Sequence, residues 1–146
     1  MFLAKDFKEF LRLLTEKSVK YLLIGGYAVT FHGYVRPTGD MDIWVDASSE
    51  NIERLILLIK EFGFGDATLS IEDFSDPTKI FRMGLPPVRI EIMTSIDGVG
   101  FQECYSSRIV SIIDGISISI INLEQLKKNK KASGRHKDLS DLDYLP

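Results

Sequence analysis

The chain has 146 residues, of which 45% are hydrophobic and 27% are charged, and its formal net charge is −3. This composition is typical of a folded globular protein and excludes the weakly hydrophobic, highly charged pattern of disordered chains. One hydrophobic core commonly forms from roughly 100 to 150 residues, so we expect a single domain over residues 1–146. An acidic net charge argues against a dedicated duplex-binding protein, whose overall field would be positive.

The cysteine count and the hydropathy pattern indicate the cellular compartment in which we expect the protein. Cys104 is the single cysteine, which excludes an intramolecular disulfide and a cysteine-based zinc cluster. Lys5 and Asp6 interrupt the apolar stretch that a signal peptide would need. No apolar run reaches membrane-spanning length, so we expect a cytoplasmic protein without a membrane partner.

The first third of the chain alternates between helical and strand patterns. Apolar residues at helical spacing predict an amphipathic helix, and a short apolar run that stops at two glycines predicts a buried strand. The predicted elements are a helix around residues 7–14, a strand at 21–24, a short helix at 27–32, a connector at 35–39 and a strand at 40–45.

The rest of the chain predicts a second long helix, four strands and two terminal helices. Ser48 or Ser49 can cap the helix, Phe62 completes its apolar stripe, and Gly63 and Gly65 end it. Asp114-Gly115 favours a two-residue hairpin turn. Residues 68–78 show no clear period, strands are predicted at 80–83, 88–93, 108–113 and 116–121, and helices at 123–132 and 137–144. This order predicts an α+β (mixed α/β) domain whose mixed sheet is flanked by helices.

Two acidic residues share one face of the predicted strand at residues 40–45. Strand side chains alternate between faces, so Asp40 and Asp42 point the same way while Met41 between them faces the core. Neighbouring carboxylates repel each other, and a divalent cation relieves that repulsion. Oxygen ligands suit Mg²⁺ or Mn²⁺. The alternative is that Asp-x-Asp is a common tripeptide and that both acids are solvent-exposed residues on the sheet without a metal-binding role.

Glycines and basic residues elsewhere add possible anion-binding groups. At a strand-to-helix turn, Gly25 and Gly26 would expose backbone N–H groups, which favour phosphate. A simple tight turn is the alternative. Basic side chains also crowd between Lys127 and Lys137, where they form either a solvated helix face or a set of cations for phosphate.

In combination these features resemble the DNA polymerase beta-like nucleotidyltransferase superfamily. Its members carry an apolar strand, Gly-Gly or Gly-Ser, a spacer and an apolar-flanked Asp-x-Asp, with a third carboxylate on a later strand. The matching residues here are Ile24-Gly25-Gly26, the spacer at 27–39 and Asp40-Met41-Asp42-Ile43. The resemblance implies a nucleotidyltransferase fold.

More closely, the chain resembles the small stand-alone branch related to abortive-infection and toxin-antitoxin nucleotidyltransferases. That branch has His-Gly and Arg-x-Thr before the acidic pair, and a late Lys followed by Gly-Arg-x-Lys-Asp. The matching residues are His32-Gly33, Arg36-Pro37-Thr38, Lys130 and Gly134-Arg135-His136-Lys137-Asp138. Glu91, in the predicted strand at 88–93, matches the third carboxylate, although the family more often has Asp there. A surface ion pair with Arg89 or Arg82 is its alternative role.

The resemblance implies that Asp40, Asp42 and Glu91 are the catalytic residues and metal ligands. It implies phosphate binding for Gly25, Gly26, Arg36, Thr38, Lys130, Arg135 and Lys137. The cofactor would be Mg²⁺ or Mn²⁺, the substrate a nucleoside triphosphate (NTP), and the acceptor a hydroxyl of RNA, a protein or a small molecule. Two metals would assist transfer of a nucleoside monophosphate to that hydroxyl, with release of pyrophosphate.

A second hypothesis keeps the fold and the triphosphate site but not the turnover. The chain would then be a catalytically weak or inactive NTP-binding protein, acting as a regulatory or antitoxin-like partner. Glu91 in place of the commoner Asp motivates this hypothesis, as does the lack of a second domain to grip a substrate. A partner protein or a homodimer would supply that grip.

Overall fold

The computed structural model describes residues 3–64 and 68–146, and it has a six-stranded mixed sheet at its centre. The strand order is β3-β4-β2-β1-β6-β5. These strands are β1 (Tyr21–Ile24), β2 (Asp40–Val45), β3 (Phe81–Met83), β4 (Arg89–Met93), β5 (Ile109–Ile113) and β6 (Ile116–Ile120). The predicted α+β class with a mixed sheet flanked by helices is confirmed.

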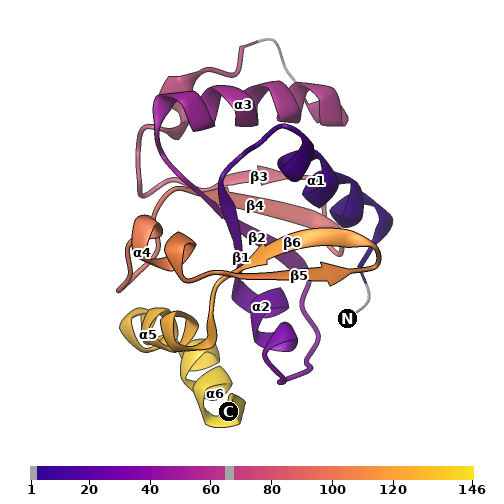
Figure 1. Cartoon of the computed structure of the whole chain (residues 1–146). Coiled ribbons are helices and arrows are strands. Elements are labelled where there is room, and N and C mark those ends of the chain that lie inside the picture. Colours follow the sequence, from indigo (N-terminus) through magenta and orange to yellow (C-terminus); the bar gives the residue numbers. More distant parts are fainter. Residues whose placement is uncertain (1–2, 65–67) are drawn as a thin grey trace.

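The helices surround the sheet in two groups. Figure 1 shows α1 and α3 together above the strands, and α5 and α6 with the C-terminus below them. The helices are α1 (Lys5–Glu16), α2 (Gly25–Phe31), α3 (Ser49–Ile59), α4 (Phe101–Ser106), α5 (Leu123–Ser133) and α6 (His136–Tyr144). Within the described ranges, no helix is both long and apolar enough to cross a bilayer.

The core lies where the central strands meet the amphipathic helices. Leu22 and Leu23 of β1, with Met41 and Ile43 of β2, are fully buried. From α1, Phe7, Phe10, Leu11 and Leu14 are also fully buried, as their helical spacing predicted. Burial of both faces of β1 explains why its sequence is a continuous apolar run.

Several predicted boundaries are confirmed by backbone geometry. The Ser48 hydroxyl accepts a hydrogen bond from the Asn51 backbone N–H, so Ser48 caps α3. A short π-helical turn (Lys60–Phe64) follows, in which Gly63 has a φ of 100°, while Gly65 lies outside the described residues. Asp114 and Gly115 both have positive φ values, as a two-residue hairpin turn requires.

Two short elements were not predicted. A 3-10 helix (Ile71–Phe74) occupies part of the segment expected to be irregular, and Ser70 and Asp73 cap it reciprocally. The helix α4 buries Cys104 and places the ring of Phe101 edge-on against Trp44, with centroids 5.1 Å apart. Both elements are too short to produce a clear helical period in the sequence.

Candidate functional site

Three carboxylates come together on one face of the sheet at strands β2 and β4. These strands are parallel, and Asp42 lies directly opposite Glu91 in the register. Asp40 and Asp42 alternate with the fully buried Met41 and Ile43, so both acids face away from that part of the core. The register therefore places Glu91 on the same face as the acidic pair, as predicted.

The glycine turn lies against this acidic face. Gly25 has a φ of +66°, and a Cβ atom added there would lie 2.2 Å from Oδ2 of Asp42. Neither the backbone conformation nor the space allows a side chain, so this position requires glycine. The predicted short helix begins two residues earlier than expected, and the two glycines form the first turn of α2.

Arg36 and Thr38 pack against the second glycine of the turn. A Cβ atom added at Gly26 would lie 2.5 Å from Oγ1 of Thr38 and 3.2 Å from Nη1 of Arg36. The two side chains come from the connector between α2 and β2. The Gly-Gly and Arg-x-Thr motifs, which are separate in the sequence, thus form one structural unit.

A pocket of about 700 Å³ joins these groups. Its lining includes both glycines, the three carboxylates, and Arg36, Lys130, Arg135 and Lys137. Thr38 is the one predicted residue outside this lining, because it lies in the wall of a neighbouring pocket. The sequence did not point to the remaining walls, which include Thr78 and Ile80 on one strand-flanking loop and Asp97 on another.

Charge repulsion and burial shape the titration of the carboxylates. Burial, followed by repulsion from Glu91 and Asp40, raises the pKa of Asp42 to about 7. Burial also raises the pKa of Glu91, and its hydrogen bond with Asp40 adds to that effect. In contrast, the hydrogen bond from Arg89 lowers the pKa of Asp40.

Arg89 is a functional candidate that the sequence suggested only as a surface ion-pair partner. Its Nε and Nη2 atoms donate to the two oxygens of Asp40, at 3.1 and 2.9 Å. Nη2 also lies 3.2 Å from Oε1 of Glu91. The sequence alone could have placed Arg89 at this site, because Arg89 and Glu91 are two residues apart in one strand and must share a face.

The donor chemistry of the site fits Mg²⁺ or Mn²⁺, since all three acidic side chains offer oxygen, and burial together with mutual repulsion raises the pKa of Asp42. Across residues 3–64 and 68–146, however, no three His, Cys, Asp or Glu side chains are grouped closely enough to hold a metal ion. The Arg89 guanidinium bridges Asp40 and Glu91 in this arrangement. Metal binding by these residues stays a prediction.

The predicted phosphate-binding cations fall into two groups. Lys130 is 4% exposed, and its Nζ atom lies 3.0 Å from Asp138 and 3.1 Å from Asp141. Arg36 donates from Nε and Nη2 to both oxygens of Asp141, at 2.7 and 2.8 Å. Lys130 and Arg36 therefore form a buried ion network that ties α5 and α6 to the α2–β2 connector.

Arg135 and Lys137 are the more accessible cations. The Arg135 side chain is 74% exposed, although its Nε atom donates to Asp138 at 2.8 Å. Lys137 is exposed at the start of α6; its charge adds to the lowering of the pKa of Asp40 by Arg89 and offsets part of the rise in the pKa of Asp42. These two side chains line the same pocket as the three carboxylates.

Over residues 3–146, the sequence matches the model of a family described as nucleotidyl transferase of unknown function (DUF2204). The chain belongs to this nucleotidyl transferase family. No protein of curated function matches the sequence significantly. Membership agrees with the polymerase beta-like resemblance of the glycine turn and the acidic pair.

Solved structures of low sequence identity share the fold of this nucleotidyl transferase. TM1012 of Thermotoga maritima, described as a candidate nucleotidyltransferase, matches with 15% identity and a TM-score of 0.62, over 94% of this chain and 88% of that chain. The lincosamide antibiotic adenylyltransferase LnuA, solved with lincomycin bound, matches with 17% identity and a TM-score of 0.58, over 97% and 94%. An antigenic nucleotidyltransferase-like protein from Paracoccidioides brasiliensis matches with 15% identity and a TM-score of 0.55, over 97% and 76%.

The buried ion network predicts a pH-dependent contribution to stability. Burial opposes ionisation of Asp138, but hydrogen bonds from Arg135 and Lys130 outweigh it and lower the pKa of Asp138 to about 2. A depressed folded-state pKa stabilises the fold above the unfolded value near 3.8, and the benefit is lost as the pH falls toward 2. We expect Asp138→Asn to lower the free energy of unfolding by about 2 kcal/mol at pH 6 and by progressively less below pH 4. Urea titrations at several pH values measure this.

Asp143→Asn is the matched control, because Asp143 is an exposed acid on the same helix. Its substitution should change the unfolding free energy by less than about 0.5 kcal/mol at every pH. A cost of Asp138→Asn that stays constant from pH 6 to pH 2 would contradict the proposed ionic origin.

Burial of Asp42 and repulsion from its acidic neighbours predict the opposite pH dependence of stability. Its folded-state pKa of about 7 exceeds the unfolded value, so the folded state is favoured at low pH and loses stability as the pH rises from about 4 to 7. In EDTA, Asp42→Asn should not alter stability at pH 4 and should raise it by about 2–4 kcal/mol at pH 8. Urea titrations at both pH values test this, and a loss of stability at pH 8 would refute the conclusion that the ionised Asp42 destabilises the fold.

Proposed function

We propose that this nucleotidyl transferase moves a nucleoside monophosphate from an NTP to a hydroxyl acceptor and releases pyrophosphate, using two Mg²⁺ or Mn²⁺ ions. The close approach of the Gly25 backbone to the Asp42 carboxylate carries this proposal, because it places the glycine turn beside two further carboxylates. Cations that line the same pocket complete the charge pattern.

In this proposal each group of residues has a separate task. Asp40, Asp42 and Glu91 would hold the ions. Bound metal neutralises charge on the attacking and leaving oxygens. Arg135 and Lys137 bind phosphate oxygens, Arg135 with the geometry for two parallel hydrogen bonds and Lys137 as a point charge. Arg89 must release Asp40 before that carboxylate can act.

The proposed chemical step is an in-line displacement at the α-phosphorus. The acceptor oxygen forms a bond to phosphorus while the bond from phosphorus to the bridging oxygen breaks, and pyrophosphate leaves with that electron pair. Glu91 accepts the proton of the acceptor hydroxyl, a role that its raised pKa suits. The backbone of Gly25 and Gly26 holds the phosphates, with Arg36 and Thr38 supporting the turn from behind.

The acceptor is a hydroxyl of RNA, a protein or a small molecule. A small-molecule acceptor is supported by the similarity to LnuA, whose fold covers nearly all of this chain. The net charge of −3 gives no general attraction to a polyanion. We further propose a single-domain cytoplasmic protein that acts with a partner protein or as a homodimer.

One observation favours a second candidate, an NTP-binding protein without turnover. Arg89 engages both Asp40 and Glu91, which leaves Asp42 as the one member of the carboxylate group that Arg89 does not bond. Such a protein would still bind a triphosphate through the turn and the basic wall, and would act as a regulatory or antitoxin-like partner.

Nucleotidyl transfer is tested with NTPs labelled at either the α- or the γ-phosphate, supplied with Mg²⁺ or Mn²⁺ and pools of RNA, protein or small metabolites. Label should move from the α-labelled NTP and not from the γ-labelled one. Asp42→Asn should lower the rate by at least about 100-fold, because the transition-state charge loses its stabilisation. Asp143→Asn is the control and should retain the wild-type rate.

The outcomes separate the two candidates. Transfer from the α-label that Asp42→Asn does not diminish would contradict the assignment of this pocket. A rise in melting temperature with Mg²⁺ and NTP, without transfer to any pool, would favour the binding protein. Equal melting shifts in the wild type and Asp42→Asn would count against both.

A further inference from the structure

The strand β5 forms one edge of the sheet and, among the described residues, pairs with β6 alone. Figure 1 shows it as the outer strand of the β5–β6 hairpin. Its five residues, Ile109–Ile113, include no charged residue and no proline. Edge strands usually carry such residues, because their unpaired N–H and C=O groups can otherwise bond to a strand of another molecule. The opposite edge is protected in this way, since β3 has three residues with the exposed Arg82 at its centre.

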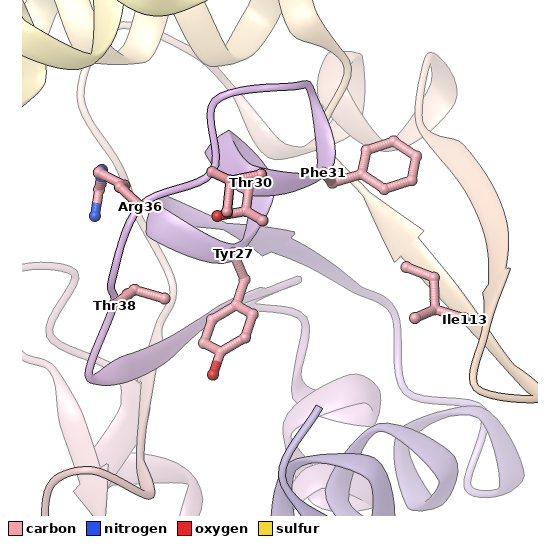
Figure 2. Close-up of a pocket in the computed structure, with 7 residues that line it drawn as sticks. Tyr27, Thr30, Phe31, Arg36, Thr38 and Ile113 are labelled. Carbon is pink, nitrogen blue, oxygen red and sulfur yellow. The ribbon is translucent and has the colours of Figure 1, made fainter. Parts of the chain in front are cut away.

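The two faces of β5 differ in their exposure to solvent. On one face, Ile113 lines the pocket beside α2 together with Phe31 (Figure 2), and Ile109 is half-buried. On the other face, Val110 is 56% exposed and Ile112 is 76% exposed. Burial of this aliphatic pair against another apolar surface would be favourable.

Opposite charges flank the strand. Arg108 precedes it and Asp114 follows it, and neither forms an ion pair within the described ranges. The guanidinium of Arg108 lies over the ring of Tyr105, at 3.9 Å from its centroid, and Nη1 donates to the Tyr105 backbone carbonyl at 2.9 Å. These contacts fix the position of Arg108 and leave Nη2 available to a carboxylate.

Two residues of β5 direct their backbone groups outward. The register pairs Ile113 with Ile116 across the two-residue turn, and the residues next to such a turn bond to each other. Along an antiparallel pair, residues that bond to the neighbouring strand alternate with residues that do not. Val110 and Ile112 therefore direct their N–H and C=O groups away from β6, where a further strand can bond to them.

These constraints favour one register for a second copy of β5. In an antiparallel pair with a twofold axis, residues with outward backbone groups must lie opposite each other. An axis at Ser111 places Val110 opposite Ile112 of the second copy. The same axis places Arg108 opposite Asp114 of the second copy. An axis at Val110 would instead place Ile112 opposite Arg108, and an axis at Ile112 would place Val110 opposite Asp114. Only the axis at Ser111 pairs aliphatic with aliphatic residues and each charge with its opposite.

We propose that β5 binds β5 of a second copy of this chain in antiparallel orientation, with the twofold axis at Ser111. Val110 and Ile112 of both copies then form one apolar cluster, an Arg108–Asp114 pair lies at each end, and the sheet continues from one copy to the other. This interface gives the proposed homodimer a defined surface. It does not rest on the proposed transfer reaction, because none of these residues lines the carboxylate pocket. A monomer that transfers label would refute the interface alone, and a dimer without transfer would refute the reaction alone.

Association is measured by sedimentation velocity over a wide range of protein concentration. We expect a reversible monomer–dimer equilibrium with a micromolar dissociation constant, because one strand edge is smaller than a standard interface. Ile112→Lys should weaken association at least about 10-fold, since it places charge in the apolar cluster. Leu57→Lys makes the same change at a 60% exposed position on α3 and should associate as the wild type does.

Three outcomes of this measurement would overturn the proposal. They are a wild type that stays monomeric up to about 1 mM, a dimer that Ile112→Lys leaves intact, and equal weakening by Ile112→Lys and Leu57→Lys.

An engineered disulfide tests the register. In the proposed pair the two Ser111 residues lie opposite each other without mutual hydrogen bonds, with Cα atoms about 4.5 Å apart, a separation that a disulfide can span. Ser111→Cys should therefore form a covalent dimer on mild oxidation. Ser117→Cys, on β6 and one strand further from the axis, should not. The native Cys104 is buried and does not compete. No covalent dimer of Ser111→Cys, or equal yields from both variants, would overturn the register.

The charges at the ends of the strand are tested by exchange. Asp114→Lys places a lysine opposite Arg108, and Arg108→Glu places a glutamate opposite Asp114, so each variant alone should self-associate about 3- to 10-fold more weakly. An equal mixture of the two pairs opposite charges at both ends and should form a heterodimer with nearly the wild-type affinity. A mixture that associates no better than the separate variants would contradict the proposed register.

Discussion

The close contact between the Gly25 backbone and the Asp42 carboxylate constrains the rest of the site. A Cβ atom at Gly25 would overlap Oδ2 of Asp42, so β1 and β2 can pair in their observed register only if the first residue after β1 has no side chain. That register then aligns Asp42 with Glu91 across the parallel β2–β4 pair. The missing side chain at Gly25 thus lets the glycine turn lie beside two carboxylates from different strands.

Much of this arrangement could be predicted because it depends on short-range geometry. Alternation along a strand places Asp40 and Asp42 on one face without any knowledge of the fold. The helical spacing of apolar residues in α1 and the positive φ required at Asp114-Gly115 are equally local. The nearness of Gly26 to Thr38 was implied by family resemblance, and packing of the connector against the turn is its physical cause.

Other features depend on contacts between residues that are distant in the sequence, and the sequence could not decide between the alternatives. The basic segment between Lys127 and Lys137 had two possible roles, a solvated face or a set of cations for phosphate, and its residues differ in their surroundings in the structure. Lys130 enters a buried network with Asp138 and Asp141, whereas Arg135 stays exposed. Only tertiary packing decides which lysine of a helix is buried, since α5 carries several with similar neighbours. Likewise, the pairing of Arg89 with Asp40 crosses between two strands whose adjacency the sequence did not specify.

The molecule combines a carboxylate group that destabilises the fold with a buried ion network that stabilises it. Burial, followed by repulsion from Glu91 and Asp40, raises the pKa of Asp42 to about 7, so the ionised Asp42 opposes folding at neutral pH unless a cation joins it. The network around Asp141 works in the other direction, because it holds α5 and α6 against the connector through Arg36 and Lys130. Arg36 also lies in the walls of both pockets. The same arginine therefore links the walls of both pockets to the buried charges that keep the C-terminal helices in place.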